Sequence, residues 1–320
     1  MSKGLNRREM LKGTGLATAA LLASPLFQWA SAQGSKTRKI LFFSRSQGFE
    51  HTPVTRPKKT PEKLSLAEEY LVALGKENNF EVTCTKDGSV FTPEGLAPFD
   101  VIMFYTTGLL DQPLGARDLA SHGEINNKPM PAGGKQALLD AVAGGKGFLG
   151  LHCATDTFHS KGGTVDPYIQ MIGGEFVHHG AQQESEIQAV TSDFGSIKGL
   201  ETFKKHEEWY ILKNIAPDMQ VLLVQNTKSM REKEYTDLAP YPETWARNHG
   251  KGRVFYSSLG HRCSVDANKD HKEDIWSSEV FKKVLLGGLQ WTSGNVEAEV
   301  KPNAKQVTPD AKFRAADKSA

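Results

Sequence analysis

Short apolar runs alternate along this chain with segments of helical periodicity. The apolar runs are clearest at residues 39–44, 101–106 and 147–151, and the helical patterns at 64–74 and 134–143. Residues 101–106 (VIMFYT) are apolar on both faces, and such strands occur in parallel sheets covered on both sides. We therefore predict a doubly wound, flavodoxin-like α/β domain with a mostly parallel sheet and helices on both faces.

Further elements continue this pattern. We expect strands at residues 80–85, 221–225, 244–247 and 253–259 and a last helix at 280–289. Two long connections, 107–133 and 227–242, lack a clear period. Connections of this length are often lids or binding loops, although harmless surface insertions would look the same.

The N-terminus carries an export pattern. Residues 6–12 (NRREMLK) match the twin-arginine consensus, and a weakly apolar run at 13–27 is followed by Ala30-Ser31-Ala32, a small-residue cleavage site. That run is shorter than the roughly 20 apolar residues of a spanning helix. We predict a signal peptide at 1–32 and a linker at 33–38. The protein would be exported folded by the twin-arginine machinery to the periplasm or beyond, with no stable membrane span after cleavage. An uncleaved anchor is the alternative.

The charge and cysteine content narrow the function classes. The formal net charge is +2, which favours neither nucleic acid nor an anionic membrane as a partner. Three cysteines, Cys84, Cys153 and Cys263, are too few and odd in number for a disulfide framework. Residues 293–320 are rich in Lys, Ala, Asp and Pro, so we expect this tail to be disordered.

Three histidines follow predicted strands. His51 lies beyond the first strand, His152 follows residues 147–151 directly, and His261 ends the strand at 253–259. The carboxyl ends of parallel strands share one rim, where ligands of α/β sheets bind. We predict that the three imidazoles converge on one pocket and could hold a divalent metal, zinc or a similar ion. No nucleotide cofactor is expected.

Other polar residues could complete this pocket. His178 and His179 are adjacent, as are Glu207 and Glu208, and neighbours in an extended segment point to opposite sides. At most one of each pair should face the site. Asp156 and Glu208 are candidate acid–base groups beside His152, whereas Cys153 stands one position late for a nucleophile elbow.

Aromatic residues follow the second pair. Trp209 and Tyr210 could stack on a sugar face, with His179 as a further substrate contact, although such aromatics often serve packing alone.

Four motifs in register carry a family resemblance. They are residues 150–158 (GLHCATDTF), 173–176 (GGEF), 207–210 (EEWY) and 250–261, which begins GKGRVFY and ends in Gly260-His261. Over residues 39–292 the chain resembles the trehalose-utilisation (ThuA-like) family. The resemblance implies a class I glutamine amidotransferase-like fold, with His152 in the place of the catalytic cysteine and amidotransferase chemistry lost. It also implies a link to disaccharide or keto-sugar metabolism.

The leading interpretation is therefore an exported sugar hydrolase, lyase or isomerase. Catalysis would be metal-assisted or would use His152 with a carboxylate. A carbohydrate-binding protein without turnover is the second hypothesis. A residual glutaminase using Cys153 is the third.

Overall fold

The computed structural model describes residues 36–122, 127–191, 194, 197–263 and 274–315. The described residues from Thr37 onward form one compact unit. The predicted signal peptide lies outside the described residues. No helix in the described part is long and apolar enough to cross a membrane.

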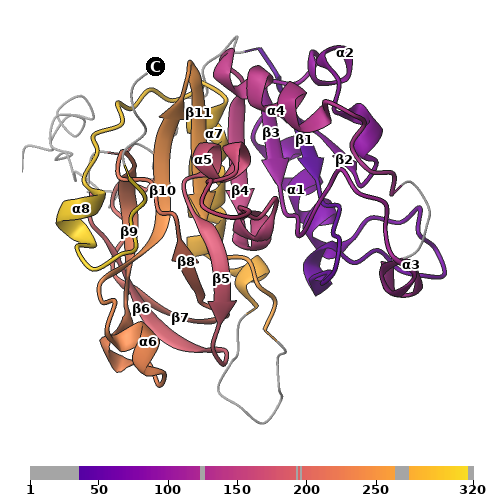
Figure 1. Cartoon of the computed structure of the whole chain (residues 1–320). Helices are drawn as coiled ribbons and strands as arrows, with labels where there is room; N and C mark the ends of the chain where they lie inside the picture. The colour runs from indigo at the N-terminus through magenta and orange to yellow at the C-terminus, as the bar shows by residue number, and fades with distance from the viewer. Residues whose placement is uncertain (1–35, 123–126, 192–193, 195–196, 264–273, 316–320) are drawn as a thin grey trace, which may run out of the picture. The chain divides into compact units, whose positions relative to one another are not determined.

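The described unit is built around a mixed sheet with strand order β2-β1-β3-β4-β11-β10-β9-β6-β7 (Figure 1). Its strands are β1 (Arg38–Phe43), β2 (Phe80–Thr85), β3 (Val101–Phe104), β4 (Gly147–Leu151), β6 (Gln183–Ala189), β7 (Phe203–Glu207), β9 (Gln220–Asn226), β10 (Tyr241–His249) and β11 (Gly252–Ser257). From β2 to β11 neighbouring strands are parallel, and from β11 to β7 they are antiparallel. The predicted fold class is confirmed.

Helices cover the parallel half on both faces. The helices are α1 (Leu66–Glu77), α2 (Pro93–Leu96), α3 (Ala116–His122), α4 (Gly134–Ala143), α5 (Pro167–Ile172), α6 (Lys233–Thr236), α7 (Glu279–Thr292) and α8 (Ala304–Val307). Tyr70 of α1 packs its ring against Trp276 and Phe281, beside and within α7. On the other face α4 packs against α2 and α5. Short 3₁₀ turns are η1 (Thr52–Val54), η2 (Gly88–Val90), η3 (His152–Asp156), η4 (Thr227–Ser229) and η5 (Ile275–Ser277).

The antiparallel half contains strands that the sequence pattern did not reveal. Strands β6 and β7 carry alternating polar residues, and their buried positions are few. A separate two-stranded sheet pairs β5 (Glu175–His179) with β8 (Tyr210–Lys213). The residues of these strands are buried mainly by contacts with neighbouring strands. Their own sequences therefore show only a weak alternation of apolar and polar residues.

The expectation of a disordered tail at 293–320 is wrong for the part that the structure describes. Residues 294–315 follow the body of the domain and include α8. Phe313 bridges to Ile215, and Arg314 donates to the carbonyls of Ile169 and Gln170. The tail is ordered because it satisfies polar groups of the domain, which a composition argument does not see.

The two long connections have structural roles. Arg45, two residues beyond β1, is fully buried and donates to the carbonyls of Leu110, Gln112 and Asn127, which fixes both ends of the 107–133 connection. Within the 227–242 connection, the Tyr235 hydroxyl donates to the Trp209 carbonyl and accepts from the Gly180 amide, both at 2.6 Å. This second connection therefore supports two segments that carry candidate site residues.

Candidate functional site

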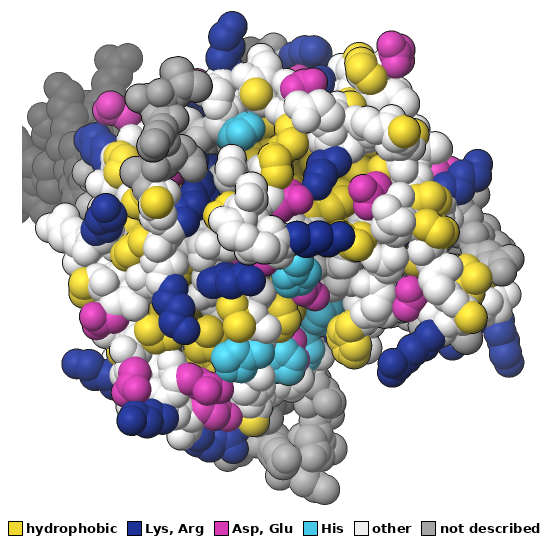
Figure 2. Space-filling view, viewed as in Figure 1, with side chains coloured by type: hydrophobic (Ala, Val, Ile, Leu, Met, Phe, Trp, Pro, Cys, Tyr) yellow, Lys and Arg dark blue, Asp and Glu magenta, His cyan; other side chains and the backbone are white. Residues whose placement is uncertain are grey.

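The imidazoles of His51, His152 and His261 converge at the carboxyl edge of the parallel strands. Their ring centroids lie 4.8 Å apart for His51 and His152, 5.6 Å for His51 and His261, and 5.3 Å for His152 and His261. The side chains come from the ends of β1, β4 and β11, as the strand map predicted. Histidines gather visibly on the face shown in Figure 2. Whether they bind a metal stays a prediction.

His152 is held in a strained turn. Its φ is +42°, which is rare for a residue with a side chain, and η3 begins at this position. Its Nδ1 lies 2.9 Å from the Ser258 carbonyl and must donate to it, because a carbonyl only accepts. In the neutral ring Nε2 therefore keeps its lone pair. This Nε2 is buried without a hydrogen-bond partner among the described residues.

His261 follows a turn fixed from two sides. Gly260 has a φ of +126°, a value that favours glycine. The Tyr105 hydroxyl and the Trp276 indole both donate to the Gly260 carbonyl, at 3.1 and 2.9 Å. These bonds hold the segment that presents His261 to the cluster.

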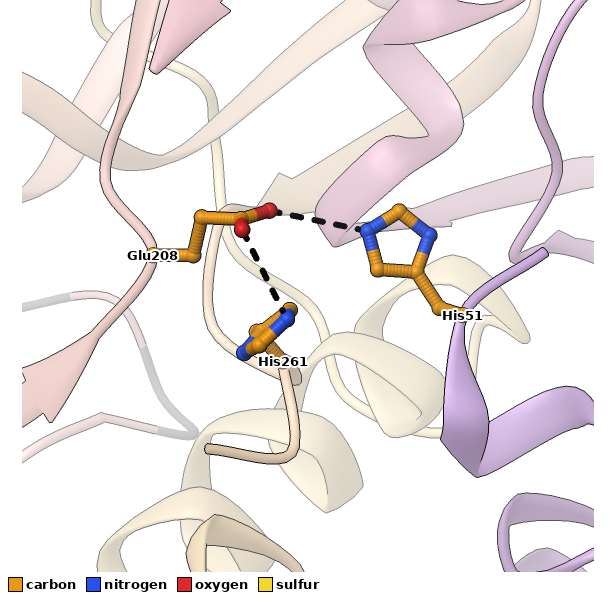
Figure 3. A group of neighbouring side chains, drawn as sticks. All are labelled: His51, Glu208 and His261. Atoms are coloured by element: carbon orange, nitrogen blue, oxygen red, sulfur yellow. Dashed lines mark ion pairs between the residues drawn. The ribbon is translucent and has the colours of Figure 1, made fainter. Parts of the chain in front are cut away.

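Glu208 is the centre of the group. One of its oxygens lies 3.6 Å from His51 Nε2 and 3.5 Å from His152 Nε2, and the other lies 3.6 Å from His261 Nε2 and 3.6 Å from His179 Nδ1. Figure 3 shows the carboxylate with one oxygen toward His51 and the other toward His261. Within the described chain, the ion pairs of Glu208 are all with imidazoles. We call Glu208, His51, His152 and His261 the Glu208 cluster.

Burial and charge set the protonation of this cluster. Burial lowers the pKa of His51 to about 4 and that of His261 to about 3. Burial alone would raise the pKa of Glu208, but the contacts with His152 and His51 outweigh it and lower that pKa. At neutral pH His51 and His261 are therefore neutral imidazoles, and Glu208 is an ionised carboxylate.

This donor set fits a divalent cation. One ligand atom from each of His51, Glu208 and His261 lies within 4.8 Å of the others. Ligands of one tetrahedral zinc ion are about 3.4 Å apart, given metal–ligand bonds of about 2.1 Å, so modest side-chain movements would close the set. His152 Nε2 is near enough to Glu208 to serve as a fourth ligand or as a base.

The paired residues divide as the alternation argument required. His179 lies beside Glu208, whereas His178 points away and pairs with Glu234 at 2.8 Å. His179 Nδ1 also donates to the Gly180 carbonyl, and its side chain is 43% exposed. His179 is therefore placed at the mouth of the cluster rather than inside it.

The two aromatic residues that the sequence pointed to, Tyr210 and Trp209, differ in their contact with the cluster. The Tyr210 hydroxyl lies 3.4 Å from His51 Nε2, and its ring lies 4.5 Å from that of His152. Trp209 is 1% exposed, and its indole donates to the Gln183 carbonyl. A ring buried in this way offers no open face, so the structure argues against Trp209 as a sugar platform.

Asp156 is not part of the Glu208 cluster. Its carboxylate accepts from His159 Nε2 at 2.5 Å, and His159 Nδ1 lies 3.3 Å from Glu175. The structure therefore gives Asp156 an ion-pair partner of its own, and its role as an acid–base group beside His152 stays a prediction.

Cys153 is fully buried, and burial raises the pKa of its thiol well above 9. A nucleophilic cysteine needs the opposite environment. This observation agrees with the expectation that Cys153 takes no part in the chemistry and removes support from the glutaminase hypothesis.

Phe49 is a site residue that the sequence argument missed. The residue is 67% exposed, and its ring meets the His51 ring edge to face at 4.8 Å. Hydrogen bonds from Gln47 to the Thr107 carbonyl and from Thr107 to the Phe49 carbonyl hold the loop. The available signal was an aromatic residue two positions before a candidate ligand at a strand end.

Comparisons with known proteins agree with this fold. The chain is similar to two solved ThuA-like proteins, one from Bacteroides uniformis (18% identity over 82% of this chain and 94% of the other, TM-score 0.56) and one from Parabacteroides merdae (14% identity, 88% and 98%, TM-score 0.55). No curated protein matches the sequence. Residues 39–292 match the model of the family described as trehalose utilisation. The chain therefore belongs to the ThuA family.

Proposed function

We propose that this protein is an exported carbohydrate-processing enzyme whose reaction centre is a divalent cation held by His51, Glu208 and His261. The observation that carries the proposal is the arrangement of Glu208, a buried carboxylate contacted by imidazoles at 3.5–3.6 Å. Contacts of this length are too long for strong hydrogen bonds. They suit groups arranged around an ion better than groups arranged around each other.

The residues have separate roles in this proposal. A bound divalent cation would polarise a sugar carbonyl or activate a water. His152, with Nδ1–H fixed on the Ser258 carbonyl, keeps Nε2 free to accept a proton from substrate or water. The Tyr210 hydroxyl, beside His51, can donate a proton to a sugar oxygen.

Sugar recognition falls to the mouth of the site. Phe49 presents an exposed ring beside His51, and His179 is half exposed beside Glu208. An aromatic face can cover the apolar side of a sugar ring, while an imidazole can bond its hydroxyls. A disaccharide or keto-sugar is the substrate class that fits this combination together with family membership.

A metal-free acid–base reaction is the second candidate. His152 Nε2 lies 3.5 Å from Glu208, so the pair could move a proton without an ion. A binding protein without turnover is the remaining alternative. It would keep Phe49 and His179 but would have no use for the buried histidines.

The test begins with metal analysis of the protein purified from its native export route. We expect at least one zinc-like divalent ion per chain, one of them bound at the Glu208 cluster, and turnover of a disaccharide or keto-sugar in a substrate panel. Activity should disappear with chelation, return with added metal and fall sharply in His152→Ala. Activity that survives complete metal removal would favour the acid–base candidate, and sugar binding without turnover would favour the binding protein.

Export is a separate part of the proposal. The support is the Arg7-Arg8 motif and the Ala30-Ser31-Ala32 run. Changing Arg7 and Arg8 together to Lys should leave the precursor in the cytoplasm, and mass spectrometry of the exported protein should find an N-terminus near Gln33. An exported protein with an intact N-terminus would contradict cleavage.

A further inference from the structure

His261 faces a different group with each of its ring nitrogens. Nε2 lies 3.6 Å from Glu208, whereas Nδ1 lies 3.5 Å from the sulfur of Cys263. Ligand atoms of Glu207, His261 and Cys263 lie within 4.8 Å of one another. The neighbouring carboxylates Glu207 and Glu208 thus flank one imidazole from two sides.

We propose that Glu207, His261 and Cys263 form a second divalent-metal site, of thiolate–imidazole–carboxylate type, that shares His261 with the Glu208 cluster. This site does not depend on the carbohydrate reaction.

The geometry supports coordination at this position. A tetrahedral zinc ion bound by a sulfur at about 2.3 Å and a nitrogen at about 2.0 Å holds these two atoms about 3.5 Å apart. The separation of Cys263 Sγ and His261 Nδ1 is 3.5 Å. This distance needs little adjustment for both atoms to bind the same ion.

Glu207 can supply the third ligand without losing its present bonds. Its side chain is fully buried, and its two oxygens accept from the amides of Gly260 and Glu208 at 3.0 and 3.2 Å. Each carboxylate oxygen has two lone pairs, so one lone pair on each remains. These amide bonds orient the carboxylate in the manner of groups that support metal ligands.

The donor set defines the class of ion. Thiolate and imidazole together select zinc and similar borderline ions over magnesium or calcium. Binding displaces the thiol proton of Cys263 to solvent. If both sites fill, His261 also releases its ring N–H proton and bridges the two ions as imidazolate. Three protein ligands leave one position of a tetrahedral ion open.

Cobalt(II) is the probe for this site, because a cobalt–thiolate bond gives a near-ultraviolet charge-transfer band that nitrogen and oxygen ligands do not. Reduced, metal-free protein titrated with cobalt should develop this band. Cys263→Ser should remove it, and the matched control Cys84→Ser, which changes another half-buried thiol, should keep it. Glu208→Ala weakens the first site and should retain the band, which separates this proposal from the proposed function.

Two results would overturn the proposal. One is cobalt binding to the wild-type protein without a sulfur band, and the other is the same band in Cys263→Ser. A measurement on the wild-type protein tests the proposal even if the variants do not fold. Saturating zinc should slow iodoacetamide alkylation of Cys263 at least tenfold and leave the rate at Cys84 unchanged. Equal protection of both thiols, or of neither, would contradict the site.

Discussion

Two buried carboxylates, Glu208 and Glu175, lie in settings of opposite character. Glu175 accepts from the Ser160 hydroxyl at 2.6 Å and amide at 3.0 Å, and from the Asn214 amide at 2.7 Å, and it pairs with Lys213 at 3.2 Å. Burial opposes its ionisation, but these donors outweigh it and lower its pKa. Glu208 instead has only imidazoles at 3.5–3.6 Å.

The difference teaches how to tell a structural carboxylate from a reactive one. Short bonds from fixed donors leave Glu175 with no unused capacity, and its role is to join β5 to β8 and to the segment that follows η3. The longer contacts of Glu208 leave lone pairs of its carboxylate unused, and one of them lies 3.5 Å from the unpartnered Nε2 of His152. A cation placed at the Glu208 cluster would bind these unused lone pairs. Glu175 therefore serves the stability of the fold, whereas Glu208 serves ligand binding.

Removing Glu208 should have the largest effect on ligand binding. We expect Glu208→Ala to weaken zinc or cobalt binding at the first site by at least about 100-fold, because a charged ligand is lost from the cluster. The free energy of unfolding should change by less than about 1 kcal/mol, since no strong hydrogen bond is broken. Calorimetric titration and urea denaturation measure the two effects. A large loss of stability with unchanged metal affinity would reverse the comparison.

Removing Glu175 should have the opposite profile. Glu175→Ala leaves Ser160, Asn214 and Lys213 without their shared acceptor, and we expect a loss of about 2–4 kcal/mol in the free energy of unfolding. The folded fraction should still bind metal with an affinity within about threefold of wild type, an order-of-magnitude bound for a site outside the cluster. Urea denaturation and metal titration of the same sample check both statements. Metal affinity that falls in parallel with stability would show that the two regions are coupled.

Two phenylalanines extend the comparison. Phe49 is 67% exposed next to His51, whereas Phe158 is 1% exposed and packs against Tyr168. Once a sugar substrate is identified, Phe49→Ala should raise its KM about tenfold, on the scale of one lost aromatic contact of about 1.4 kcal/mol, with stability unchanged. Phe158→Ala is the control and should destabilise the fold by about 3 kcal/mol. An unchanged KM in Phe49→Ala would remove this ring from substrate recognition.

The smallest effect concerns pH. The hydrogen bond with Asp156 raises the pKa of His159, although burial opposes it. A raised folded-state pKa stabilises the protein below the unfolded value of about 6.5. That contribution is lost as the pH rises through the raised value. The urea midpoint of the wild type should therefore fall more between pH 6 and pH 9 than that of His159→Gln. Parallel pH profiles would mean that the Asp156–His159 pair contributes nothing measurable.

The sequence by itself determined the parallel half of the sheet and the rim formed by the carboxyl ends of its strands. Apolar strands at 101–106 and 147–151 required cover on both faces, and parallel strands place their carboxyl ends together. The convergence of His51, His152 and His261 follows from that rule. Each strand can be recognised from a short stretch of sequence, and each histidine follows the end of one such strand. Alternation likewise required that only one of Glu207 and Glu208 enter the cluster.

Only the tertiary structure decided which side chains are exposed to solvent and which are buried. Trp209 is buried because Gln183 and Tyr235, distant in sequence, lie against it, and Phe49 is open because Thr107 holds its loop. The choice of Glu208 over Glu207 depends on the Gly260 amide, which follows β11 and donates to Glu207, and the ordered tail depends on contacts of Arg314 with the body of the domain. A side chain's environment is set by long-range pairing, which periodicity within one segment cannot encode.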